Sequence, residues 1–147
     1  MKTIKIGEKE YKIQFGYIAT AKSGIIKELV KIEDLLGDGN SVIENLDKIL
    51  MFIPELMLVG LQKFHRDEFG YNYDTKEGRE EALEKASQLV DDYFDGEDAG
   101  FKELFNSLEE ELLHNGFLSS MFREEQESQS KEQSQTQTKK EKEKEEN

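Results

Sequence analysis

The sequence predicts a mostly α-helical domain, in which an N-terminal β-hairpin packs on a bundle of about five helices, followed by a disordered C-terminal tail. Three observations predict this fold. Apolar and polar residues alternate over residues 3–15, as in a strand with one buried face. Further along, apolar residues recur at spacings of three and four, as on one face of a helix. Residues 124–147 contain no apolar side chain, so we expect a domain at residues 1–123 and a solvated tail at residues 124–147.

The hairpin is expected from two short alternating segments on either side of a glycine-containing turn at residues 7–10. Its predicted buried face consists of Ile4, Ile6, Tyr11, Ile13 and Phe15. A two-stranded hairpin alone is only marginally stable in water. We therefore expect its apolar face to lie on the helices.

The first helix is predicted over residues 18–36, with a weak point at Ser23-Gly24 because glycine is a poor helix former. Its predicted inward face consists of Ile18, Ala21, Ile25, Ile26, Leu29, Ile32 and Leu36. After a glycine-rich turn, Ser41 and Glu44 have the spacing of a capping box, which predicts a second helix over residues 42–52.

Pro54 favours a helix break near Ile53, because proline is unfavourable inside a helix but accepted in a first turn. We predict a third helix over residues 54–66. The segment 49–61 is almost entirely apolar, which indicates a buried central helix pair. We expect Met51 and Met57 in its core; the alternative is that they belong to a surface that binds another polypeptide, because methionine adapts to varied apolar partners.

Two further helices complete the predicted bundle. Asp74 and Glu77 form another N-terminal box, before a fourth helix over residues 75–94. Its apolar stripe consists of Ala82, Leu83, Ala86, Leu89, Val90, Tyr93 and Phe94. The fifth helix is expected over residues 99–115, with Gly116 as a left-handed cap. Its inward residues are Phe101, Leu104, Phe105, Leu108, Leu112 and Leu113, and its acidic outer face carries Glu103, Glu109, Glu110 and Glu111.

The charge and composition argue against several classes of function. The chain has 33 acidic and 20 basic residues, and the tail holds eight Glu and five Lys, so residues 1–123 carry a net charge of −10. A domain with this negative charge is poorly suited to bind nucleic acid or anionic membranes. The absence of cysteine excludes disulfides, cysteine-ligated zinc and thiol catalysis. The N-terminus has no apolar signal segment, and no run of about 18 apolar residues occurs, so we expect a cytoplasmic protein.

Catalytic and metal-binding motifs are not found in the sequence. His65 and His114 are far apart, and each is explained as a polar residue near a helix end. Neither Asp38-Gly39 nor Asp95-Gly96 has the preceding ligands of a calcium loop, and no glycine-rich phosphate loop or nucleophile elbow occurs. We therefore expect a protein that is not an enzyme and has no cofactor and no metal.

A short apolar strip after the fifth helix is the best candidate for binding another polypeptide. It lies between the expected stop at Gly116 and the polar tail, so it has few apolar neighbours close in sequence. The alternative is that it belongs to the core. The residues predicted to bind a partner are Phe117, Leu118, Met121 and Phe122.

The segments IKIGEKEYKIQFGY at residues 4–17 and FKELFNSLEEELLHNGF at residues 101–117 carry a resemblance to a known family. In its order of elements the chain resembles the tail assembly chaperones of long-tailed phages of Gram-positive bacteria. The resemblance implies a non-enzymatic, self-associating protein of the host cytoplasm that is not part of the mature virion. It implies binding to the tape measure protein, which is long, helical and apolar, with the major tail tube protein as a second partner.

Two other functions are compatible with the sequence. One is a structural connector or tail completion protein of the virion. The other is an acidic inhibitor that mimics DNA, although the acidic residues are interleaved with lysines such as Lys9, Lys22 and Lys31. The presence of the protein in purified particles would indicate the first alternative.

Overall fold

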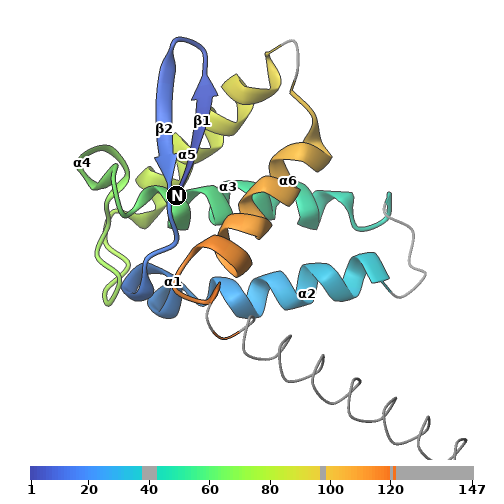
Figure 1. The fold of residues 1–147 in the computed structure, drawn as a ribbon, viewed down its shortest axis with the longest axis horizontal. Coiled ribbons are helices and arrows are strands. Elements are labelled where there is room, and N and C mark those ends of the chain that lie inside the picture. Colours follow the sequence, from blue (N-terminus) through green and yellow to red (C-terminus); the bar gives the residue numbers. More distant parts are fainter. Residues whose placement is uncertain (38–42, 97–98, 120, 122–147) are drawn as a thin grey trace, which may run out of the picture.

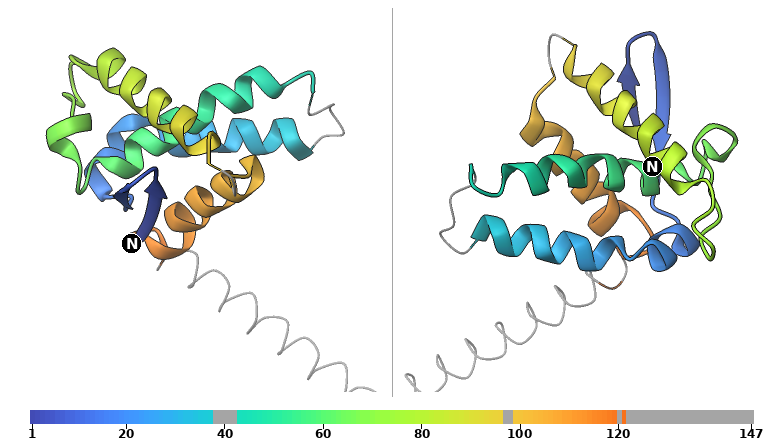
Figure 2. Two further views of the ribbon diagram at one scale, coloured as in Figure 1. Left: turned by 90° about the horizontal axis from the view of Figure 1, so that it is seen from above. Right: turned by 180° about the vertical axis from the view of Figure 1, so that it is seen from behind.

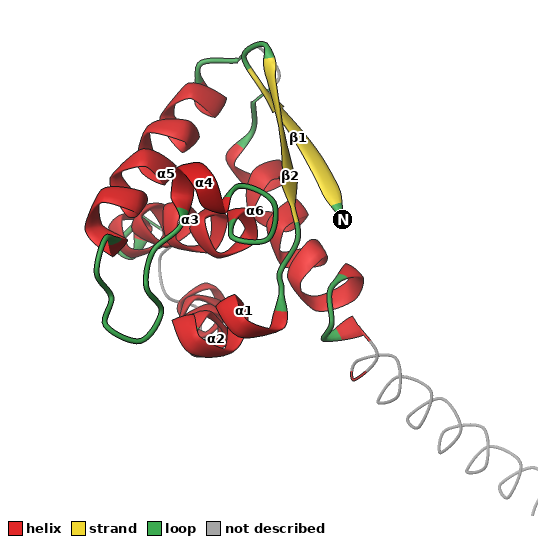
Figure 3. Ribbon diagram, turned by 90° about the vertical axis from the view of Figure 1, so that its left-hand side faces the viewer, coloured by secondary structure: helices red, strands yellow, loops and turns green. Residues whose placement is uncertain are grey.

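The long helix α3 (Leu46–Leu61) lies at the centre of the fold, and most other elements pack against it (Figure 1). The structure is a computed structural model that describes residues 1–37, 43–96, 99–119 and 121. The hairpin lies on one side of α3 and α2 (Ile25–Gly37) on the other, as the side view shows (Figure 3). The predicted fold class, a hairpin on a set of helices, is confirmed. The tail predicted at residues 124–147 lies outside the described residues.

The predicted hairpin is present, with β1 (Lys2–Ile6) antiparallel to β2 (Lys9–Ile13). Gly7 has a φ of +64°, which suits the first position of a two-residue hairpin turn. All five residues predicted for the inner face are buried: Ile4, Ile6, Tyr11, Ile13 and Phe15.

Gly60 sets the distance between the hairpin and α3. A Cβ atom at this position would lie 2.7 Å from Cγ2 of Ile13 and 3.2 Å from Cζ of Phe15. The Gln14 amide donates a hydrogen bond to the Gly60 carbonyl at 3.0 Å, directly after β2. A glycine inside α3 therefore allows the two backbones to approach closely.

The predicted weak point at Ser23-Gly24 is a true break between α1 (Tyr17–Ser23) and α2, because Gly24 adopts a left-handed conformation with φ +73°. Of the predicted inward face, Ile25, Leu29 and Ile32 on α2 are buried as expected. The rest of that face is wrong, because the helix is interrupted at Gly24 and the buried residues of α1 are Ala19 and Thr20. The residues that were expected inside but are exposed are Ile18, Ala21, Ile26 and Leu36.

The predicted break at Pro54 is also wrong, because α3 continues through this residue. The flanking turns bury Phe52, Ile53, Leu56 and Met57. Burying each such side chain is worth about 1.5–3 kcal/mol, which outweighs the cost of about 3 kcal/mol for proline in a helix. The helix begins at Leu46, later than predicted, and Ser41 of the expected capping box lies outside the described residues.

After α3 the chain forms the single turn α4 (Arg66–Phe69) and a loop, and then α5 (Arg79–Phe94). The predicted box of Asp74 and Glu77 does not cap α5, which starts later. Asp74 instead forms an ion pair with Lys22, with its Oδ1 atom 2.7 Å from Nζ. This contact connects the loop to α1. The predicted apolar stripe of α5 does face the core.

The last helix is α6 (Phe101–Glu110), which continues into the π-helical turn η1 (Glu111–Asn115). Its predicted inward residues are buried or half-buried as expected. Two details are corrected. Gly116 is extended, with φ −96°, and is no left-handed cap, and Glu111 is buried although it was assigned to the outer face. The wider turn of η1 brings Asn115 Nδ2 within 3.2 Å of Glu111 Oε2.

The chain start lies beside the end of α6 (Figure 2). The Met1 ammonium is 2.7 Å from the buried Oε1 of Glu111, which explains why this carboxylate is inside. Buried carboxylates need such a partner. This ion pair fixes η1, and hence the segment after it, against β1.

Candidate partner-binding surface

The structure divides the four predicted partner-binding residues. Phe117 is 39% exposed and Met121 is 61% exposed, as a binding surface requires. Leu118 is half-buried and packs against the core. Phe122 lies outside the described residues. Leu118 thus anchors the strip, and Phe117 and Met121 are exposed to solvent.

Two residues at the start of α1 extend this strip. The rings of Tyr17 and Phe117 meet edge to face, with centroids 5.4 Å apart. Tyr17 is 68% exposed and Ile18 is 58% exposed. We call Tyr17, Ile18, Phe117 and Met121 the C-terminal apolar surface, because the ring contact joins the two segments.

Backbone contacts position this surface. An added Cβ at Gly116 would be 3.3 Å from the Phe15 carbonyl oxygen, so the chain passes close to the end of the hairpin. The Ser119 amide donates a hydrogen bond to the Gly116 carbonyl at 3.0 Å, which forms a turn. The exposed rings therefore stand on an ordered support.

A hollow of about 420 Å³ adjoins the C-terminal apolar surface, and Tyr17 and Ile18 line both. Lys63 and Arg66 also line it, together with Tyr73, and among the described residues no acidic side chain does. We call it the basic hollow.

Arg66, Tyr73 and Gln62 form one wall of the basic hollow and contact one another. The Arg66 guanidinium lies 4.5 Å from the centre of the Tyr73 ring and donates a hydrogen bond to the Tyr71 carbonyl at 3.1 Å. The Tyr73 hydroxyl donates to Gln62 Oε1 at 3.2 Å. Burial raises the pKa of the Tyr73 hydroxyl, and the Arg66 charge opposes this shift, so the ring stays neutral at physiological pH.

A second apolar area lies where α2 and α3 run side by side. Ile32, Leu35 and Phe52 contribute to a groove of about 590 Å³, with charges of both signs around it. Met51 also lines the groove and is exposed, so its predicted place in the core is wrong, whereas Met57 is fully buried as predicted.

The histidine that the structure explains most fully has a structural role. His65 Nε2 accepts a hydrogen bond from the Lys12 amide at 2.9 Å, and its ring packs against Tyr11. His65 therefore joins β2 to the start of α4.

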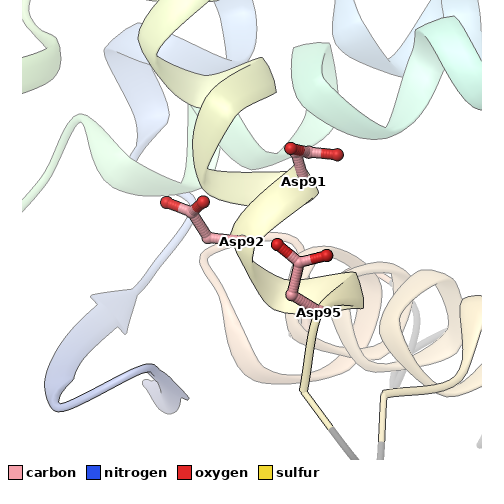
Figure 4. A group of neighbouring side chains, drawn as sticks. All are labelled: Asp91, Asp92 and Asp95. Atoms are coloured by element: carbon pink, nitrogen blue, oxygen red, sulfur yellow. The ribbon is translucent and has the colours of Figure 1, made fainter.

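One group of acidic side chains has the separation of metal ligands. Carboxylate oxygens of Asp91, Asp92 and Asp95 lie within 4.8 Å of one another at the end of α5 (Figure 4). All three residues are exposed, and Gln88 donates a hydrogen bond to Asp92 at 3.1 Å. The group does not have the sequence spacing of a calcium loop, because its three residues come from the end of one helix. An exposed acidic cluster alone does not identify a metal site.

Sequence reasoning missed Tyr17, Ile18 and the two cations of the basic hollow. Ile18 was assigned to the inward face of a single long helix, and only the break at Gly24 could have suggested otherwise. Lys63 and Arg66 have a helical spacing of three, but Lys63 lies in the turn after α3 and Arg66 begins α4. Their proximity to Tyr17 depends on tertiary contacts.

Within the described part of the chain, no helix has the length and apolar character needed to cross a membrane. Comparisons of the sequence with protein-family models and with curated proteins, and of the structure with solved structures, give no match.

Proposed function

We propose that this protein is a tail assembly chaperone of a long-tailed phage, which binds the tape measure protein and keeps it soluble while the tail forms. The chaperone acts without catalysis in the host cytoplasm and leaves before the virion matures. The proposal rests on the resemblance of residues 4–17 and 101–117 to that family, and on one structural observation. That observation is the C-terminal apolar surface, which is exposed on an otherwise acidic domain.

Exposed apolar side chains that gather on one surface are typical of sites that bind other proteins. Tyr17 and Phe117 form such a group, because their rings touch each other while both remain accessible. Aromatic residues supply much of the binding energy at protein interfaces. The surface thus suits an apolar helix of a partner.

The charge of the domain suits the same role. A long apolar helical protein aggregates when it is exposed to water. A coat of domains that each carry a net charge of −10 would keep such complexes apart by repulsion. The apolar surface would bind, and the acidic remainder would face solvent.

The small size of the surface also suits a partner that must be released. Each exposed apolar side chain contributes on the order of 1–3 kcal/mol when buried at an interface. Affinity spread over several copies of a weak site can be lost in steps when tail tube subunits replace the chaperone.

Co-expression with the tape measure protein of the same phage tests the proposal. The variant Phe117→Ser/Met121→Ser should fold normally, because both side chains are exposed, but should leave most of the tape measure protein insoluble. We expect at least a tenfold loss of affinity in a pull-down, from two apolar contacts.

The matched control is Val30→Ser/Ile43→Ser, which removes two exposed apolar side chains that line neither the basic hollow nor the groove between α2 and α3. It should keep the tape measure protein soluble. If both double variants behave like wild type, the C-terminal apolar surface is not the binding site. If the protein is found in purified particles, it is a structural component and the chaperone proposal is wrong.

A further inference from the structure

We infer that the basic hollow receives an acidic side chain of the bound partner, next to the apolar residues that cover the C-terminal apolar surface. The inference rests on the proposed function and specifies the partner: an amphipathic helix in which a Glu or Asp flanks the apolar face. Tyr17 and Ile18 connect the two parts of the site, because they belong to the apolar surface and also line the hollow.

The charges around the hollow support this inference. The described residues of its lining include Lys63 and Arg66 and no carboxylate, on a domain with a net charge of −10. Asp67 and Glu68 follow Arg66 in sequence but do not line the hollow, and Glu68 is held by Lys9 on the hairpin at 3.1 Å. This patch is therefore locally basic although the protein is acidic.

Lys63 is available for a partner. Its side chain is exposed, and it makes no hydrogen bond or ion pair with the described residues. Arg66 is fixed over the Tyr73 ring by its bond to the Tyr71 carbonyl, and a guanidinium has further donors. A carboxylate that enters the hollow would meet one fixed cation and one adjustable cation.

The location of the cations also argues for selectivity. An apolar surface alone accepts any apolar helix, so it does not fix the orientation or the register of the partner. A charge pair at its edge adds little affinity but penalises the wrong sequence. The basic hollow would select helices that carry an acidic residue at one position beside the apolar face.

Two synthetic helical peptides test the inference. They share one apolar face of leucine and phenylalanine and differ at a single flanking position, which is Glu in one and Lys in the other. The net charge of the protein favours the Lys peptide, whereas the basic hollow favours the Glu peptide. At 0.15 M salt the distant charges are screened beyond about 8 Å. We therefore expect the Glu peptide to bind about fivefold tighter, as for an exposed ion pair.

The variant Lys63→Glu should abolish or reverse this order of affinities, measured by fluorescence anisotropy. Lys102→Glu makes the same change in charge at an exposed position on α6 and should preserve the order. Tighter binding of the Lys peptide to wild type, or equal behaviour of the two variants, would overturn the inference.

The same assay separates the inference from the proposed function. If Phe117→Ser/Met121→Ser weakens both peptides but neither prefers Glu, the apolar site stands and the acidic partner residue does not. If neither peptide binds wild type, both proposals fail. If Lys63→Glu changes only self-association in sedimentation experiments, the hollow binds a second copy of the chain and the inference is wrong.

Discussion

Phe15 and Tyr17 are two residues apart in the sequence, but they have opposite environments. Phe15 is 1% exposed and lies against Gly60 of α3, whereas Tyr17 is 68% exposed. Among the described aromatic residues, Tyr17 contacts only the partly exposed ring of Phe117. The difference arises at Gly16, where the chain leaves the hairpin and α1 begins. It separates an aromatic residue that holds the fold together from one that is available to a partner.

The comparison extends to the regions around these residues. The hairpin contact with α3 is closed by Gly60, which lets Ile13 and Phe15 reach the helix backbone. In the part of the chain that the structure describes, no such contact covers Tyr17. Apolar character alone therefore does not assign a residue to the core, because the assignment depends on whether a distant segment can approach.

The largest expected effect distinguishes the two regions directly. Phe15→Ala should lower the free energy of unfolding by about 3–5 kcal/mol, because it leaves a cavity between β2 and α3. Phe117→Ala should cost less than about 1 kcal/mol, because its ring is already partly in solvent. Urea unfolding measures both, and similar losses for the two variants would contradict the comparison.

The close approach at Gly60 predicts the next largest effect. Gly60→Ala places a Cβ at 2.7 Å from the buried Ile13 Cγ2, so the hairpin must shift. Crowding costs about 1–3 kcal/mol, and helix propensity returns up to about 1 kcal/mol, so we expect a net loss of about 1–2 kcal/mol. Gly37→Ala is the control, since a Cβ there meets nothing within 4 Å. A Gly60→Ala protein as stable as wild type would show that the contact is not tight.

The buried face of α1 contains one polar side chain whose replacement should stabilise the fold, that of Thr20. Its hydroxyl is buried and has no hydrogen-bond partner among the described residues. Thr20→Val keeps the shape and removes the unpaired hydroxyl, so it should raise the stability by about 1 kcal/mol. A loss of stability in thermal unfolding would mean that the hydroxyl has a partner such as a bound water.

The smallest expected effect is a pH dependence on α6. Burial raises the pKa of the half-buried Glu109, and the negative charge of Glu33 adds to this, while His114 opposes it. Because the folded protein holds this proton more tightly than the unfolded chain, the resulting stabilisation is present at low pH and is lost as the pH rises through the raised pKa. Glu109→Gln should therefore raise the melting temperature slightly at pH 7 and not at pH 4. An equal gain at both pH values would exclude the titration of Glu109 as the cause.

Much of the fold could be predicted because its signals are local. The alternation around Gly7 identified the hairpin and its buried face, and spacings of three and four identified the stripes of α5 and α6. The glycine at position 24 correctly indicated a break, because the left-handed conformation is a property of the residue itself.

The errors concern features that depend on distant parts of the chain. The continuity of α3 through Pro54 reflects the packing of both flanks in the core. The burial of Glu111 depends on the Met1 ammonium. No local pattern contains either contact.

The candidate site could be predicted only in part for the same reason. Phe117 and Met121 were found because they lie between a helix stop and a polar tail. Tyr17 belongs to the site because the chain passes from the hairpin into α1 beside Phe117. Lys63 belongs to it because the turn after α3 lies next to the start of α1.

Site-specific photo-crosslinking can show whether the C-terminal apolar surface binds the tape measure protein. A photoreactive phenylalanine analogue replaces Tyr17 in one variant and Ile43, which is 82% exposed, in another. Each variant is co-expressed with the tape measure protein and irradiated. We expect a crosslink to the tape measure protein from position 17 and little from position 43. A soluble complex that crosslinks from position 43 and not from position 17 would contradict this expectation.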